Sequence, residues 1–196
     1  MIEYIKGNVE SLTPTSVVLD NHGIGYLLQI SLNTYTAIQS QSECKLYVYE
    51  AIREDAYLLF GFSKMEERDI FLLLIGVSGV GANTARMILS SLTVEELKQG
   101  IVSENVSMLQ SVKGIGIRTA QRILVDLKDK IQKSKLLQSD MPLVSSTSNQ
   151  VRSEALAALQ MLGFPLSASQ KAVNKLMVEA PDMPVEQVVK AALKLL

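Results

Sequence analysis

The chain has 196 residues, 47% of them hydrophobic, a composition that excludes a disordered chain and predicts one to three small globular domains. The formal net charge of −1 gives no overall attraction to nucleic acid, so binding of DNA or RNA would need local clusters of basic residues. One cysteine and one histidine exclude an internal disulfide and a Cys-x-x-Cys pair and disfavour a catalytic triad, so we expect no metal, no cofactor and a reducing, cytoplasmic environment.

Residues 2 to 62 contain five short runs of β-branched and aromatic residues, which predict five strands. These runs are Ile2–Val9, Ser16–Leu19, Gly25–Ile30, Cys44–Tyr49 and Ala56–Phe60. Turn signals separate them at Thr13-Pro14, at Asn21-His22-Gly23 and at Arg53-Glu54-Asp55, which makes His22 a turn residue. A five-stranded unit of this length favours a small closed barrel of the OB-fold type over residues 1–63, and a three-stranded sheet with loose loops is the alternative.

After Gly61 the hydrophobic pattern becomes helical, and it predicts an all-α domain of short helices over residues 64–137. The longest apolar run, Ile70 to Ile75, is far too short to span a bilayer, and the N-terminus has no basic flank leading into an apolar stretch. We therefore expect no targeting segment and no contact with a membrane.

Residues 138–150 are rich in serine and polar residues without a period, which predicts a flexible linker. The segment 151–196 then contains three helix candidates, Val151–Leu162, Ser167–Val178 and Val185–Leu195, with Ser167 and Pro184 at expected helix starts. Three short helices make a marginal domain that more often binds a partner than catalyses a reaction. The fold expected for the chain is thus α+β and multidomain.

Two segments of the helical region repeat at an offset of 35 residues. The offset pairs seven identical residues: Val77 with Val112, Gly79 with Gly114, Gly81 with Gly116, Thr84 with Thr119, Ala85 with Ala120, Ile88 with Ile123 and Leu89 with Leu124. Such self-similarity indicates a duplicated structural unit. Each copy is interpreted as a helix, a Gly-apolar-Gly turn and a second helix beginning near Ala82 or Ile117, which together form a helix-hairpin-helix element.

The duplicated hairpins have features that are typical of phosphate-binding sites, which we call phosphate seats. Glycine allows positive φ and close approach of the backbone to a ligand, and the following helix start offers unpaired N–H groups. The residue between the glycines, Val80 or Ile115, is expected to turn inward as a plug, while Ala85 and Ala120 would let the two helices approach closely. Together these features predict binding of one phosphate at each hairpin.

The glycines allow three other interpretations. A dinucleotide-binding fingerprint needs a preceding strand and a third glycine, and a Walker phosphate loop needs Gly-Lys-Ser/Thr, which is absent from the chain. The remaining alternative is a pair of helical hairpins with ordinary glycine turns. Duplication argues against that alternative.

Local charge favours the second hairpin. Residues 105–133 contain six basic and two acidic residues, a balance of +4, and Arg118 and Arg122 lie one helical turn apart. Near the first hairpin only Arg86 is basic, and Asn83 occupies the position that matches Arg118. We expect the first hairpin to bind phosphate less strongly, and binding to be largely independent of base sequence because phosphate contacts carry no base information.

With a predicted barrel, two glycine hairpins, a linker and a small helical segment in this order, the chain resembles the RuvA family of Holliday-junction-binding proteins along its whole length. The residues that carry the resemblance are the start Met1-Ile-Glu-Tyr-Ile-Lys-Gly, the segment Arg53-Glu-Asp-Ala-Tyr-Leu-Leu-Phe-Gly-Phe62, both hairpins, the linker and the C-terminal helical module. The resemblance implies an OB-fold barrel, a tandem helix-hairpin-helix domain and a small three-helix (UBA-like) domain.

The resemblance also implies a function in DNA recombination, DNA repair and the SOS response to DNA damage. The family implies a homotetramer, in some cases stacked as an octamer, that binds a four-way junction without being an enzyme itself. Its C-terminal module is implied to engage the hexameric ATPase RuvB, which drives branch migration, and the junction resolvase RuvC is a further candidate partner. Glu54 and Asp55 would form an acidic pin where the strands cross, although two such carboxylates alone would be ordinary turn residues.

The expected DNA contacts surround the two hairpins. They are Gly79, Val80, Gly81, Asn83, Thr84, Arg86, Lys113, Gly114, Ile115, Gly116, Arg118, Thr119 and Arg122. Candidate contacts to the motor are Leu156, Leu159, Met161, Leu162 and Phe164, although a stripe at helical spacing is more often core. Other functions left open are a DNA repair glycosylase or lyase that uses Lys113 and Asp126, and a protein-interaction adaptor without DNA.

Overall fold

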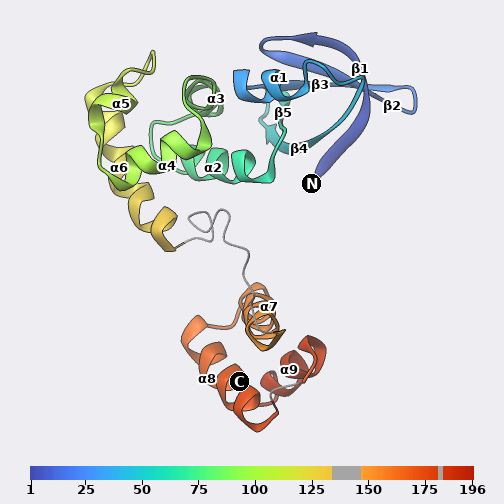
Figure 1. Cartoon of the computed structure of the whole chain (residues 1–196), viewed down its shortest axis with the longest axis vertical. Helices are drawn as coiled ribbons and strands as arrows, with labels where there is room; N and C mark the ends of the chain where they lie inside the picture. The colour runs from blue at the N-terminus through green and yellow to red at the C-terminus, as the bar shows by residue number, and fades with distance from the viewer. Residues whose placement is uncertain (134–146, 181–182) are drawn as a thin grey trace. The chain divides into compact units, whose positions relative to one another are not determined.

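The computed structural model describes residues 1–133, 147–180 and 183–196. The chain divides into two compact units, Met1–Ser139 and Asp140–Leu196 (Figure 1). Within the described residues the first unit contains β1 to β5 and α1 to α6, and the second contains α7 to α9. None of the helices in these ranges is long and apolar enough to cross a membrane.

The first five strands close into a barrel, which confirms the OB-type prediction over the three-stranded alternative. They are β1 (Tyr4–Thr13), β2 (Ser16–Asn21), β3 (Ile24–Ile30), β4 (Glu43–Ile52) and β5 (Tyr57–Phe62), in the order β1-β2-β3-β5-β4. The pairing of β4 with β1 closes the barrel, and β3 with β5 is the only parallel pair among the strands described. Alternating residues such as Leu19, Leu28 and Leu46 fill the interior.

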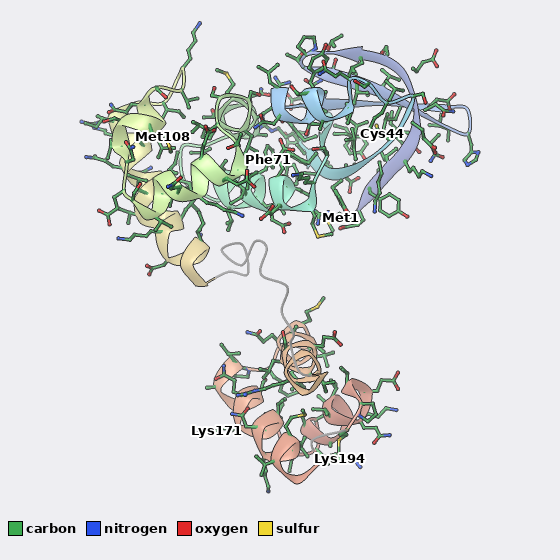
Figure 2. All side chains as sticks on the ribbon, viewed as in Figure 1. Met1, Cys44, Phe71, Met108, Lys171 and Lys194 are labelled. Carbon is green, nitrogen blue, oxygen red and sulfur yellow. The ribbon has the colours of Figure 1, made fainter. Side chains whose placement is uncertain are left out.

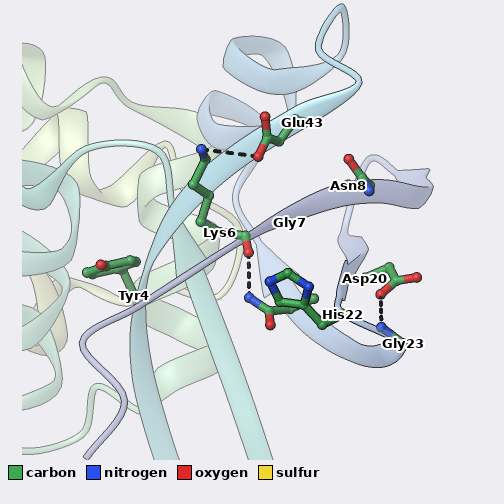
Figure 3. Close-up of a pocket in the computed structure, with 9 residues that line it drawn as sticks. Tyr4, Lys6, Gly7, Asn8, Asp20, His22, Gly23 and Glu43 are labelled. Atoms are coloured by element: carbon green, nitrogen blue, oxygen red, sulfur yellow. Dashed lines mark hydrogen bonds and ion pairs between the residues drawn. The ribbon is translucent and has the colours of Figure 1, made fainter.

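The turn between β2 and β3 contains His22, as expected. His22 has φ 50° and Gly23 has φ 85°, and the side-chain Oδ1 of Asp20 accepts a hydrogen bond of 2.7 Å from the Gly23 N–H. Figure 3 shows this turn beside a polar surface cleft, in which the Asn21 amide donates to the Lys6 carbonyl at 2.7 Å. Left-handed backbone at two successive residues is the geometry of a tight hairpin turn.

A short helix, α1 (Leu32–Ile38), lies between β3 and β4 and was not anticipated from the sequence. Ser31 begins it by accepting a hydrogen bond from the Thr34 N–H at 3.0 Å, and Ile38 is buried in the barrel core. Seven residues are too few to give a readable helical period, so only the Ser31 cap signalled it.

The helical part of the first unit contains α2 (Met65–Ile75), α3 (Ala82–Ser91), α4 (Val94–Val102), α5 (Val106–Gln110) and α6 (Ile117–Lys133). Its core includes Phe60 and Phe62 of β5, whose rings lie 5.4 and 4.8 Å from that of Phe71 in α2. Figure 2 labels Phe71 where the helices meet the barrel. The last four residues of β5, 59–62, are therefore buried on both faces: Leu59 belongs to the core of the barrel, and Phe60 and Phe62 belong to the core of the helices.

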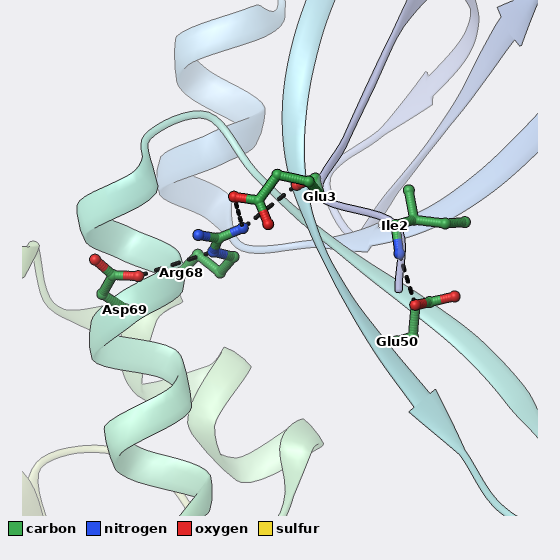
Figure 4. A network of polar contacts seen from close by, with 5 residues as sticks. All are labelled: Ile2, Glu3, Glu50, Arg68 and Asp69. Carbon is green, nitrogen blue, oxygen red and sulfur yellow. Dashed lines mark hydrogen bonds and ion pairs between the residues drawn. The ribbon is translucent and has the colours of Figure 1, made fainter. Parts of the chain in front are cut away.

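Polar contacts fix the helices to the barrel. The buried carboxylate of Glu67 in α2 accepts hydrogen bonds from the hydroxyls of Ser31 and Thr34, and burial raises its pKa. Figure 4 shows Arg68 in an ion pair with Glu3 at 2.7 Å. On the other side, the Asn33 amide donates to the carbonyls of Leu89 and Leu92 at the end of α3, at 2.7 and 3.0 Å.

The second unit contains α7 (Thr147–Met161), α8 (Leu166–Glu179) and α9 (Val185–Ala192) around its own small core. Helix α7 begins four residues before the expected Val151, so the last four residues of the predicted linker are helical, and residues 138–146 lie outside the described residues. Pro165 and Pro184 are the N-caps of α8 and α9, which places Ser167 inside the first turn of α8.

Candidate nucleic-acid interface

The two glycine hairpins have the same backbone geometry. Gly79 and Gly114 have φ 91° and 90°. In each copy the N–H of the next residue donates to the carbonyl three residues earlier, Val80 to Val77 at 3.0 Å and Ile115 to Val112 at 3.1 Å. The second helices begin at Ala82 and Ile117, as predicted. The repeat in the sequence is thus a repeat in structure.

The plug positions are also confirmed. Val80 and Ile115 are 5% and 6% exposed, and Ala85 and Ala120 are completely buried where the helices meet. The side chains of Val80 and Ile115 therefore belong to the core, and they hold each turn in place without facing a ligand. Their place among the expected DNA contacts is corrected to a supporting one.

The helix starts that follow the hairpins present N–H groups without an acceptor. Helices α1, α4 and α5 are each capped by a side chain, whereas α3 has no side-chain cap, like α2, α8 and α9; the capping residues are Ser31, Thr93 and Asn105. Across the described ranges, no hydrogen bond is found from the N–H groups of residues 82–84 or 117–119. Uncapped N–H groups and the helix dipole both attract anions, so the prediction that each hairpin binds a phosphate agrees with this geometry.

Gly81 and Gly116 have no need of glycine within the protein. Gly81 has φ −87°, Gly116 is outside the positive-φ region, and a Cβ added at either would meet nothing within 4 Å. An alanine would fit both positions in the isolated chain. Their lack of a side chain leaves the backbone open to a ligand that approaches from outside.

The basic residues divide between the interface and the fold. Lys113 and Arg118 are exposed and form no hydrogen bond or ion pair within the residues that the structure describes. Asn83 is likewise exposed at the matching position of the first hairpin, and Thr84 and Thr119 are half-buried. The second hairpin therefore carries more positive charge than the first, in line with the sequence.

Arg86 has a role other than the one expected. Its Nη1 donates at 3.0 Å both to the Thr15 carbonyl and to Oε1 of Gln29, and both acceptors belong to the barrel. The guanidinium therefore anchors α3 to the barrel through Nη1, and a contact of its remaining N–H donors with DNA stays a prediction. An isolated basic residue beside a hairpin gave no sequence signal that would distinguish the two roles.

Glu54 and Asp55 lie exposed in the turn between β4 and β5, where the Arg53 N–H donates to the Ala56 carbonyl at 2.8 Å. The base of this hairpin is braced by Glu50, whose carboxylate accepts from the Tyr57 hydroxyl at 2.6 Å and from the Ile2 N–H at 2.7 Å. The hydrogen bond from Tyr57, followed by that from Ile2, lowers the pKa of Glu50, so this brace carries a negative charge. Figure 4 shows the contact between Ile2 and Glu50.

The expected motor contacts separate into core and surface residues. Leu159 is completely buried, so its expected role as a contact is corrected to a core position, and Leu156 and Phe164 are partly buried against the same cluster. Met161 and Leu162 are 90% and 59% exposed at the end of α7. Two large apolar side chains exposed together mark a surface suited to a partner.

The three parts of the chain match three family models. Residues 1–61 match the RuvA N terminal domain, residues 71–129 match a SAM-like helix-hairpin-helix tandem, and residues 150–196 match the RuvA C-terminal domain.

Relatives match the chain from end to end. The chain is 55% identical to a protein of Bacteroides fragilis over 99% of both chains, and 56% identical to one of Parabacteroides distasonis over the whole of both. A protein of Porphyromonas gingivalis is 45% identical over the whole of both chains. Each of these relatives is named Holliday junction branch migration complex subunit RuvA.

Proposed function

The chain belongs to the RuvA family, and from that premise we propose that it binds four-way DNA junctions as a scaffold subunit of a branch-migration complex. The observation that carries the proposal is the pair of hairpins with open glycines and unpartnered helix N–H groups. Each hairpin would hold one backbone phosphate through N–H groups, with Lys113 and Arg118 adding charge at the second. Binding of this kind selects the shape of the DNA and not its base sequence.

Selectivity for junctions requires several copies of the chain. We propose a homotetramer in which four acidic turns at Glu54 and Asp55 meet at the centre, as the family implies. Their carboxylates would repel the converging phosphates and hold the strands apart. The exposed side chains of Ile52, Tyr57 and Leu58 flank this turn, at 72%, 57% and 40% exposure, and would be covered on assembly.

The proposed role is not catalytic. The second unit would recruit the ATPase RuvB, and ATP hydrolysis would take place there. The glycosylase or lyase alternative would need Lys113 and Asp126 at one site, yet Asp126 lies nine residues into α6, about 13 Å along the axis from the helix start beside Lys113. We therefore do not propose that alternative.

A binding titration tests the proposal. The chain should bind a four-way junction more tightly than a linear duplex of the same sequence. A plot of the logarithm of the binding constant against the logarithm of the salt concentration should have a slope of about −0.9 for each phosphate contacted. A mass measurement on the complex should give four chains per junction, or eight if two tetramers stack. Equal affinities for junction and duplex would refute junction selectivity.

Neutralising the acidic turn is expected to weaken selectivity. Glu54→Gln with Asp55→Asn should strengthen binding to linear duplex, by about three- to ten-fold, because repulsion at the centre is lost, and should narrow the preference for junctions. Competition gel shifts with both DNAs measure the change. Glu10→Gln, at an exposed position on β1, serves as the matched control. An unaltered preference would show that Glu54 and Asp55 are ordinary turn residues.

A further inference from the structure

The two hairpins are joined by a contact between an arginine and a loop. Arg122, in the second turn of α6, directs its Nη1 to the first hairpin, where it donates to the Ser78 carbonyl at 3.2 Å and to the Ser78 Oγ at 3.1 Å. Ser78 directly precedes Gly79. A side chain of the second repeat therefore holds the loop of the first repeat, next to the glycine that forms its turn.

This contact uses two positions at which the repeats differ. At the offset of 35 residues, Ser78 corresponds to Lys113, and Arg122 corresponds to Met87. A lysine at position 78, as in the second repeat, would place a positive charge against Arg122. The hydroxyl at one position and the guanidinium at the other are complementary, and neither is duplicated.

We propose that Arg122 is a positioning residue that clasps the first hairpin and makes the two phosphate seats one site of fixed spacing. The proposal rests on the proposed function and deepens it: the ligand is a pair of phosphates on one DNA arm, and the clasp sets the distance between the seats that hold them. Two seats of fixed spacing bind together more tightly than two seats that move independently, because less freedom is lost on binding.

The contact between Arg122 and Ser78, which we call the clasp, adds to packing that already fixes the two hairpins. Val77, Val80, Val112 and Ile115 lie in a single hydrophobic cluster, so the roots of the two hairpins are fixed by packing. Ser78 and Gly79 are exposed beyond that cluster, and among the described residues the side chain that contacts this loop by hydrogen bonds is Arg122. A guanidinium has five N–H donors, so the edge that does not contact Ser78 still offers positive charge to a phosphate between the seats.

Variants at Ser78 separate a clasp from a plain phosphate contact. Ser78→Ala removes no charge, yet it should lower junction affinity by about three-fold with an unchanged salt dependence. Ser78→Lys adds a positive charge beside the DNA but opposes Arg122, so it should lower affinity as well. The matched control is Asn83→Arg, which adds the same charge to the same hairpin away from the clasp and should raise affinity and steepen the salt dependence.

Arg122→Lys, which keeps the charge, should lower junction affinity by about three- to ten-fold, because lysine lacks the rigid planar fork with which one edge of the guanidinium contacts Ser78 while the other edge faces a phosphate. Arg152→Lys, at an exposed position of α7 in the second unit, is the matched control and should stay within about two-fold of the wild type. Adding Ser78→Ala to Arg122→Lys should cause little further loss, since both break one contact.

These variants are measured in the full chain, with the melting temperature as the test of folding. If Ser78→Lys strengthens binding as Asn83→Arg does, or if Ser78→Ala and Arg122→Lys both match the wild type, the clasp is wrong. If instead the wild-type chain itself shows no preference for junctions, the proposed function fails, and the two failures are therefore distinguishable.

Discussion

Replacing Gly81 and Gly116 together by alanine is expected to lower the affinity for four-way junctions by about 100-fold while leaving the fold intact. A Cβ at either position meets nothing within 4 Å in the protein, so neither packing nor φ opposes the change. The same Cβ would stand between the backbone and an approaching phosphate. Loss of a charge-assisted hydrogen bond at each of the two hairpins, at about 1.5 to 3 kcal/mol each, sums to about 3 to 6 kcal/mol, so a 100-fold loss is the lower limit of the expected effect.

The control for this experiment is a glycine that is strained but remote. Gly23→Ala, in the barrel turn where φ is 85°, should lower the melting temperature by a few degrees, since alanine there costs about 1 kcal/mol, and should leave DNA binding unchanged. Gly114→Ala combines both effects because its φ is 90° and it lies in a hairpin. Full junction affinity in a folded Gly81→Ala, Gly116→Ala protein would exclude the hairpin backbone as the phosphate seat.

The hairpins were predictable because their signal is local. Each feature depends on residues that are close together in the sequence: the spacing of the glycines, the start of the second helix and the buried residue between the glycines. The repeat at an offset of 35 residues shows each of these features twice. All three expectations are confirmed, down to matching φ angles at Gly79 and Gly114. The five strands were predictable for a similar reason, because hydrophobic and polar residues alternate along strands such as β2 when one face of the strand is buried.

What the sequence did not reveal depends on contacts between distant segments. Arg86 looked like a DNA contact because it is basic and near a hairpin, yet its acceptors are Thr15 and Gln29, 71 and 57 residues away. The run Ala56–Phe60 was expected only as one strand of the barrel, but Phe60 and Phe62 of β5 pack against Phe71 in α2 and belong to the core of the helices. Leu159 could be core or contact by its spacing, and only burial decided between them.

The same limit explains the clasp. Ser78 and Arg122 are 44 residues apart, and neither has a feature that points to the other. The repeats share the residues that form each hairpin, whereas the contact that joins the repeats uses positions at which they differ. A duplicated element that must act as one site needs such asymmetric positions, because identical surfaces cannot both supply the donor and the acceptor of a single contact.

Ending the chain at residue 139 is expected to abolish stimulation of the RuvB ATPase while changing junction affinity by less than about two-fold. The second unit has a hydrophobic core of its own, and the hairpins and the acidic turn all lie in the first unit. Removing the second unit therefore takes away the proposed docking surface, and the first unit keeps its own hydrophobic clusters. ATPase rate at saturating junction DNA and junction affinity are the two measurements.

A single substitution tests whether the exposed apolar surface at the end of α7 is needed for stimulation of the ATPase. Leu162→Asp should reduce stimulation of the ATPase by at least about ten-fold in the full chain, because Leu162 is 59% exposed and a buried carboxylate at a contact is costly. Val178→Asp, which alters an 82% exposed residue of α8, is the matched control and should retain stimulation. If truncation also removed junction binding, the second unit would be part of the DNA site; if Leu162→Asp kept full stimulation, the motor would dock elsewhere on the second unit. Retention of ATPase stimulation by the truncated chain would instead place the motor contact on the first unit.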